Sequence, residues 1–148
     1  MAWRRSSVKT LAGVLVLLAA AHSATAAESP SARVILVLDA SGSMLQRLEG
    51  RRRIEIARDV LVSLVEETLP AGTPLALRVF GHRTPGACQT DLEIPLTPLQ
   101  PEEVVPVIRR TEAKNLAKTP IGASLELVAA DLADATGPKI VILVTDGE

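Results

Sequence analysis

Hydrophobic positions along the chain follow two patterns, one typical of buried strands and one typical of helices with one buried face. Residues 34–38 and 140–144 are unbroken aliphatic runs rich in β-branched side chains, and each leads into a polar loop that contains an aspartate, Asp39 or Asp146. Runs of this length are typical of strands buried on both faces of a parallel sheet. We therefore predict two such strands, each with an aspartate at its carboxyl end.

Three helices are predicted between these strands. Hydrophobic residues recur at three- and four-residue spacing over residues 54–68 and 121–132, which is the period of a helix that buries one face. A third helix is expected over residues 101–110, where Pro106 should shorten or kink it. The arginines at positions 51–53 precede the first helix, and we interpret them as its solvated start.

Two further strands complete the predicted α/β fold. Residues 75–80 are predicted to form a third strand segment of this sheet, and prolines limit residues 91–96 to a short edge strand or hairpin arm. The alternation of strands and helices indicates a mostly parallel sheet. A strand of such a sheet is normally followed by a covering helix, whereas this sequence stops at Glu148. We therefore expect the domain to be truncated at its C-terminus.

The N-terminal segment is predicted to be a secretory signal peptide. Three basic residues among the first nine precede the apolar run 11–21 and the small residues Ala24-Thr25-Ala26. The alternative, an uncleaved anchor, is disfavoured because no stop-transfer pattern follows. We expect a periplasmic or secreted protein with no transmembrane segment after signal cleavage. The predicted division is a signal peptide at 1–26, a linker at 27–32 and a domain at 33–148.

Composition and charge exclude one class of partner. The 148 residues include 16 Lys and Arg against 17 Asp and Glu, and only 1% are aromatic. Nucleic-acid binding needs a basic excess and rings on which bases can stack, so we expect no nucleic-acid partner. After removal of the signal peptide, Phe80 is the one remaining aromatic residue. The core must therefore be built from aliphatic side chains.

The candidate chemistry begins where the first strand ends. Asp39, Ser41 and Ser43 place a carboxylate and two hydroxyls at alternate positions, and Gly42 allows the loop to turn tightly. Oxygen groups of this kind suit hard cations, and Mg²⁺ takes about six of them. The alternative interpretation is an ordinary turn followed by a helix cap.

Two later residues would reach the same edge of the sheet. Thr119 precedes Pro120 and, taken alone, is an ordinary helix cap, while Asp146 with Gly147 is an ordinary turn. If the two aspartate-bearing strands are neighbours, however, Asp39 and Asp146 lie side by side. Their carboxylates then repel each other unless a cation or a shared proton relieves the repulsion.

These pieces resemble a known site. Asp39-x-Ser41-x-Ser43, Thr119 in Lys-Thr-Pro-Ile-Gly and Asp146 in Val-Thr-Asp-Gly occur in the order seen in the metal-ion-dependent adhesion site of von Willebrand factor type A (VWA) domains. The resemblance covers residues 33–148. It implies a doubly wound, Rossmann-like sheet with helices on both faces, and a divalent cation, Mg²⁺ or alternatively Mn²⁺ or Ca²⁺, held by these five residues.

The resemblance also implies a function. In such domains the hydroxyls contact the metal directly or through water, the aspartates act through bridging waters, and a protein partner's Asp or Glu fills the open coordination position. We therefore expect a metal-dependent adhesion module and not an enzyme. The alternatives are a metal-dependent hydrolase, for which the sequence offers no evident general base or His-paired nucleophile, and a structural VWA domain of an envelope assembly.

Two residues of the loop after the predicted strand 75–80 have separate interpretations. Cys88 is the single cysteine of a chain that we expect to be exported. Bacterial secreted members that the sequence resembles often carry a cysteine after Thr-Asp-Gly-Glu, which implies a disulfide from Cys88 to a cysteine beyond Glu148. His82 has no second His or Cys at metal-binding spacing, so we predict a solvent-facing turn histidine.

Overall fold

The computed structural model describes residues 32–147, so the predicted signal peptide lies outside the described residues. Strands and helices alternate along this part of the chain. In chain order the elements are β1 (Arg33–Asp39), the 3-10 turn η1 (Gly42–Leu45), β2 (Arg47–Leu48), β3 (Arg51–Arg52), α1 (Arg53–Ser63), the π-helical turn η2 (Leu64–Thr68), β4 (Pro74–Phe80), β5 (Thr90–Pro98), α2 (Pro101–Arg110), α3 (Ile121–Asp131) and β6 (Lys139–Val144).

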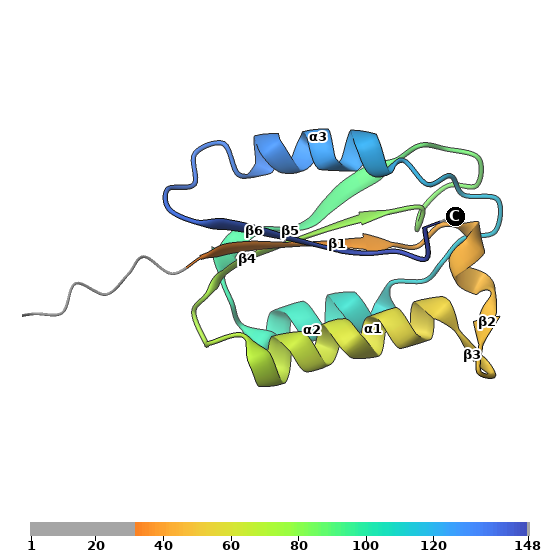
Figure 1. The fold of residues 1–148 in the computed structure, drawn as a ribbon, viewed down its shortest axis with the longest axis horizontal. Coiled ribbons are helices and arrows are strands. Elements are labelled where there is room, and N and C mark those ends of the chain that lie inside the picture. The colour runs from red at the N-terminus through yellow and green to blue at the C-terminus, as the bar shows by residue number, and fades with distance from the viewer. Residues whose placement is uncertain (1–31, 148) are drawn as a thin grey trace, which may run out of the picture.

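The main sheet has the strand order β5-β4-β1-β6. β1 pairs in parallel with β4 on one side and with β6 on the other, whereas β5 runs antiparallel to β4. Helices α1 and α2 cover one face of the sheet and α3 covers the other (Figure 1). The predicted mostly parallel α/β sheet with helices on both faces is therefore confirmed, and the two aspartate-bearing strands are neighbours.

The core is built around β1, whose side chains alternate between the two faces of the sheet. Leu36 and Leu38 pack with residues of α1 and α2, while Ile35 and Val37 pack with Phe80 and with α3. All of these side chains are fully buried. Successive residues of a strand point to opposite faces, so a strand with helices above and below must be apolar throughout. The unbroken aliphatic run of β1 meets that requirement.

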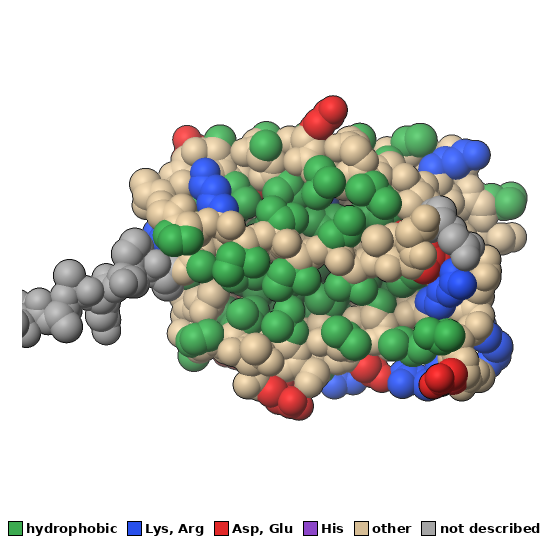
Figure 2. All heavy atoms as spheres, viewed as in Figure 1, with side chains coloured by type: hydrophobic (Ala, Val, Ile, Leu, Met, Phe, Trp, Pro, Cys, Tyr) green, Lys and Arg blue, Asp and Glu red, His purple; other side chains and the backbone are tan. Residues whose placement is uncertain are grey.

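β6 differs from the predicted strand, which was expected to be buried on both faces. Ile140 and Val141 are 46% and 44% exposed, because β6 is an edge strand in the part of the sheet that residues 32–147 form. Figure 2 shows hydrophobic side chains gathered across the middle of the molecular surface on the side of β6, between α3 and α1. The sequence run therefore identified the strand correctly but not its burial.

Helix α2 keeps its full predicted length although Pro106 lies inside it. Its apolar face is buried in the core, whereas Pro106 itself is exposed. Packing of that face outweighs the loss of one backbone hydrogen bond, so Pro106 does not shorten the helix, and the alternative of a kink stays a prediction. Within the described residues, no helix is both long enough and apolar enough to cross a bilayer.

The arginines at 51–53 do not form a simple solvated helix start. Arg51 and Arg52 belong to the β2–β3 hairpin, which turns at Glu49 and Gly50 with φ values of 51° and 85°. Two consecutive residues of positive φ are typical of a tight hairpin turn. Helix α1 begins only at Arg53, and Glu55 caps it by accepting a hydrogen bond from the backbone N–H of Arg52.

Candidate metal site

The candidate site lies at the carboxyl edge of the sheet, where β1 and β6 end side by side. Pairing of Leu38 with Val144 places the loops that follow these two strands next to each other. The β1 loop carries Ser41 and then enters η1 with Ser43, and the β6 loop carries Asp146. In doubly wound sheets this edge is where ligands bind.

Asp39 is completely buried, and both of its carboxylate oxygens accept hydrogen bonds from the chain. Oδ1 accepts from the backbone N–H of Ser41 at 2.8 Å, and Oδ2 accepts from the Thr145 hydroxyl at 2.7 Å. A buried carboxylate needs such donors. The two bonds fix the orientation of the side chain and still leave each oxygen capacity for one further partner.

Ser43 connects the two loops. Its hydroxyl lies 3.1 Å from Ser41 Oγ and donates to Asp146 Oδ1, also at 3.1 Å. Ser41 and Asp39 are joined through the backbone bond already described. Four of the five predicted site residues thus form one continuous hydrogen-bonded group.

Thr119, the fifth predicted residue, is not part of this hydrogen-bonded group. Among residues 32–147, no hydrogen bond joins its hydroxyl to the other four side chains. The segment before it is tied to the β1 loop, since Gly42 N–H donates to Ala117 O at 3.3 Å and Lys114 N–H donates to Ala40 O at 3.1 Å. Thr119 is also not the helix cap, because α3 begins at Ile121 and Pro120 occupies the cap position.

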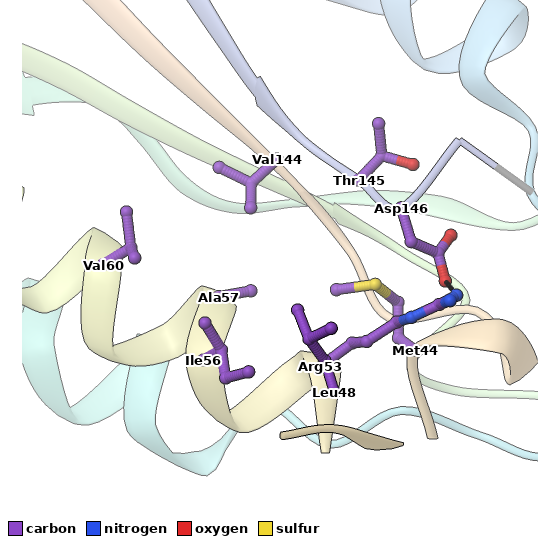
Figure 3. A pocket seen from close by; sticks show the side chains of 9 residues that line it. All are labelled: Met44, Leu48, Arg53, Ile56, Ala57, Val60, Val144, Thr145 and Asp146. Atoms are coloured by element: carbon purple, nitrogen blue, oxygen red, sulfur yellow. Dashed lines mark hydrogen bonds and ion pairs between the residues drawn. The ribbon is translucent and has the colours of Figure 1, made fainter. Parts of the chain in front are cut away.

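Arg53 is part of the site, although no sequence pattern placed it there. Its guanidinium donates to Asp146 Oδ2 at 2.6 Å (Figure 3). The two side chains are only 25% and 7% exposed, so the ion pair is shielded from solvent. The positive charge of Arg53 therefore offsets the carboxylate of Asp146 and relieves the expected repulsion between Asp146 and Asp39.

Gly81 is a second residue that sequence reasoning missed. It follows β4 with a φ of 76°, and a Cβ atom at this position would lie 2.6 Å from the backbone nitrogen of Ser41. Only glycine allows both this backbone conformation and this close approach. A glycine directly after the apolar run 75–80, at the same edge of the sheet, was the signal that could have revealed it.

The loop that follows Gly81 corrects one expectation and leaves another open. His82 is not solvent-facing, because its side chain is only 12% exposed and its Nε2 lies 2.9 Å from Glu93 Oε1. Cys88 is exposed and has no disulfide partner among residues 32–147. The bridge to a cysteine beyond Glu148 therefore stays a prediction.

The chemistry of the donor set fits a hard divalent cation. The five predicted residues offer hydroxyl and carboxylate oxygens only, which are the ligands of Mg²⁺ and Ca²⁺. Neighbouring ligands of an octahedral Mg²⁺ ion lie about 3.0 Å apart when each metal–oxygen distance is about 2.1 Å. The Ser41 and Ser43 hydroxyl oxygens, 3.1 Å apart, have close to that separation.

Comparison with solved structures places the fold among known domains. BatB from Bacteroides thetaiotaomicron superimposes with a TM-score of 0.67 and 24% identity, over 80% of this chain and 55% of that one. An aerotolerance-related membrane protein from Bacteroides fragilis gives a TM-score of 0.65 and 24% identity, with the same two coverages. At this level of identity the likeness concerns the fold alone.

Sequence comparison identifies the family. Two uncharacterized Bacillus subtilis (strain 168) proteins, YwmD and YwmC, are 32% identical over 146 residues and 31% identical over 150 residues. These alignments cover 92% and 88% of this chain but 64% and 60% of the relatives, so the chain spans about three fifths of their length. Residues 34–148 match the von Willebrand factor type A domain family. The chain therefore belongs to the von Willebrand factor type A domain family.

Proposed function

We propose that this domain is an exported, metal-dependent module that binds a protein partner through an acidic side chain. Mg²⁺ would be held by the hydroxyls of Ser41, Ser43 and Thr119, with Asp39 and Asp146 acting through water. The observation that carries the proposal is the continuous group of Asp39, Ser41, Ser43 and Asp146 at the carboxyl edge of the sheet. Mn²⁺ and Ca²⁺ accept the same ligands.

The distribution of charge supports an acidic partner. Asp39 already accepts two hydrogen bonds, and Asp146 pairs with Arg53, so neither carboxylate is fully available to neutralise a cation. Mg²⁺ bound mainly by neutral hydroxyls keeps much of its positive charge. A carboxylate from a partner's Asp or Glu would then complete the coordination shell favourably.

Metal binding on this proposal requires one local rearrangement. The Thr119 hydroxyl must join the group formed by the two serines. The hydrogen bonds from Gly42 to Ala117 and from Lys114 to Ala40 support this step, because they hold the preceding segment against the β1 loop. Thr119 is only two residues from Ala117, so it follows directly on the segment that these bonds hold.

An envelope location is part of the same proposal. The basic and apolar pattern of residues 1–26 supports export. Two solved relatives are described as membrane proteins, one from Bacteroides fragilis as aerotolerance-related and one from Vibrio fischeri as membrane-spanning. Fusing residues 1–26 to a reporter enzyme that is active only outside the cytoplasm would test the location.

Binding of an acidic peptide tests the function directly. The probe is a short peptide with one central Asp between glycines, and the control is the same peptide with Asn in place of Asp. In Mg²⁺, the Asp peptide should shift the amide NMR signals of residues around Ser41 and Ser43, whereas the Asn peptide should not. The shifts should disappear in the Ser43→Ala variant. Equal shifts with the two peptides, or shifts that persist in a chelator, would contradict the proposal.

A further inference from the structure

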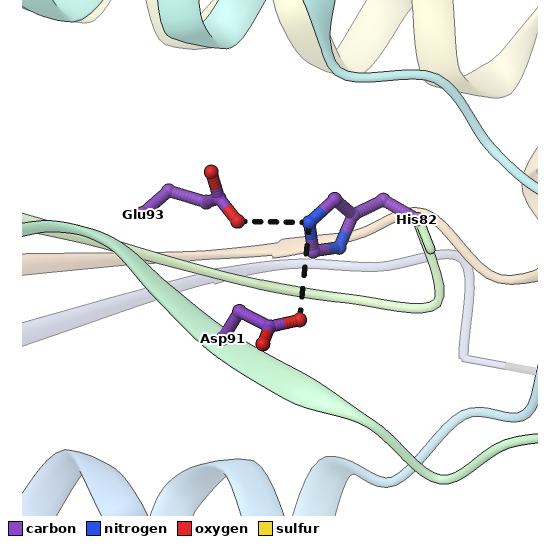
Figure 4. A group of neighbouring side chains, drawn as sticks. All are labelled: His82, Asp91 and Glu93. Atoms are coloured by element: carbon purple, nitrogen blue, oxygen red, sulfur yellow. Dashed lines mark hydrogen bonds and ion pairs between the residues drawn. The ribbon is translucent and has the colours of Figure 1, made fainter. Parts of the chain in front are cut away.

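A second cluster of metal-binding side chains lies on the β4–β5 side of the sheet, away from the five oxygen donors. His82 directly follows Gly81 at the end of β4, and Asp91 and Glu93 lie on β5 (Figure 4). Their side chains are 12%, 25% and 17% exposed. Among residues 32–147, this is the one group of three or more His, Cys, Asp or Glu residues whose ligand atoms lie within 4.8 Å of one another.

The separations between these atoms suit a tetrahedral metal ion. His82 Nε2 lies 2.9 Å from Glu93 Oε1 and 3.9 Å from Asp91 Oδ2. Ligands of tetrahedral zinc, each about 2.0–2.1 Å from the metal, lie roughly 3.3–3.4 Å from one another. These two separations lie within about 0.6 Å of that value. The third separation, between the two carboxylates, is below 4.8 Å.

Arg83 now neutralises the two carboxylates. Its Nε lies 3.0 Å from Asp91 Oδ2, and its Nη2 contacts Glu93 Oε1. The hydrogen bond to Asp91 and the charges of Glu93 and Asp91 raise the pKa of Arg83 above its usual value. The Arg83 side chain is 50% exposed, so it can swing into solvent without leaving a cavity in the core. A divalent cation could therefore take its place.

The surroundings provide access and room for a fourth ligand. His82 and Glu93 line a polar hollow of about 310 Å³ that reaches Thr111 and Lys114 after helix α2. His82 Nδ1 is buried and has no hydrogen-bond partner among the described residues. Nε2 is therefore the ring nitrogen with polar partners among the described residues, and it faces both carboxylates.

We propose that His82, Asp91 and Glu93 form a second metal site, suited to Zn²⁺, in which the metal replaces the guanidinium of Arg83. One imidazole and two carboxylates are established zinc ligands, and the fourth position stays open to water. The metal would tie the edge strand β5 to the segment after β4. Because Gly81 packs against Ser41, this also anchors the β1 loop of the first site, although the two sites share no ligand.

Cobalt(II) is the probe that separates this site from the oxygen-only site, since tetrahedral cobalt absorbs visible light far more strongly than octahedral cobalt. The untagged full chain would carry His22→Ala and Cys88→Ser to remove the other imidazole and the exposed thiol. We expect the tetrahedral band to saturate at one equivalent of cobalt and to vanish when Zn²⁺ is added. Ser43→Ala should leave the band unchanged.

Single substitutions in that background decide the assignment. His82→Ala and the size-preserving Glu93→Gln should each weaken cobalt binding at least tenfold, whereas Arg83→Gln should strengthen it several-fold because the competing cation is gone. Asp134→Asn, at an exposed position in the turn after α3, is the matched control and should change nothing. If His82→Ala does not fold, Glu93→Gln alone carries the test. Absence of the band, or a band unchanged in Glu93→Gln, would overturn the proposal.

Discussion

Gly81 shows how one residue outside the metal-binding motif can shape the site. Its φ of 76° and its closeness to the Ser41 backbone leave no room for a side chain. Gly81→Ala should lower the free energy of unfolding by roughly 2–4 kcal/mol, because the new methyl group adds a backbone clash to the cost of a left-handed conformation. Urea unfolding followed by circular dichroism measures the loss.

Gly86→Ala is the matched control for this substitution. Gly86 has nearly the same φ, 77°, but a Cβ atom there would meet open space. Gly86→Ala should therefore lower the free energy of unfolding by only about 1 kcal/mol, which is the cost of the left-handed conformation alone. Equal losses in the two variants would show that the contact between Gly81 and Ser41 carries no extra constraint.

The sequence predicted the meeting of four site residues but not the residues that support them. Asp39, Ser41, Ser43 and Asp146 come together because two recognisable strands end at one edge, which strand pattern and topology determine. The bond from Thr145 to Asp39 and the ion pair from Arg53 depend on cross-strand register and side-chain rotamers. A one-dimensional pattern carries no information of that kind.

At the level of elements, α3 is held to the sheet by a buried ion pair in addition to its apolar contacts. Arg78 on β4 donates through Nε and Nη2 to the two carboxylate oxygens of Asp131, at 2.8 and 2.9 Å. The two side chains are 5% and 11% exposed. Arg78 interrupts the apolar run of β4, and Asp131 is the residue that makes its burial tolerable.

Asp131→Ala should therefore destabilise the domain more than its small change in size would suggest. The loss should be about 3–5 kcal/mol in urea unfolding, because the variant leaves the Arg78 charge buried without its carboxylate partner. Asp134→Ala, at an exposed position three residues further on, should change stability by less than about 0.5 kcal/mol. Similar losses in the two variants would mean that the ion pair does not hold α3.

Elements were predicted more reliably than their surroundings. The strands β1 and β6 were recognisable because a buried parallel strand needs a continuous aliphatic run, and β4 was recognisable from a mostly apolar segment despite Arg78. The exposure of Ile140 and Val141 was not predictable, because the same run serves a central or an edge strand. Likewise, Pro106 was expected to shorten α2, but burial of the opposite face of that helix decides its length.

At the scale of the whole molecule, the fold and the family agree with the expectation drawn from the sequence. An aliphatic core with Phe80 as its one buried ring lies on two faces of a sheet whose carboxyl edge gathers the polar residues. The relatives from Bacillus subtilis are longer than this chain, so their activities as whole proteins bear on it only by analogy. The proposed metal site is the feature that would connect this fold to a function.

Calorimetric titration of Mg²⁺ into the full chain tests that connection most directly. The account predicts one saturable site in the wild-type chain and a loss of at least about tenfold in affinity, roughly 1.4 kcal/mol, in Ser43→Ala. Ser63→Ala, which removes a hydroxyl at the end of α1 that donates to Glu67 in η2, should bind like the wild type. Absence of binding by the wild-type chain, or equal affinity in Ser43→Ala, would contradict the account.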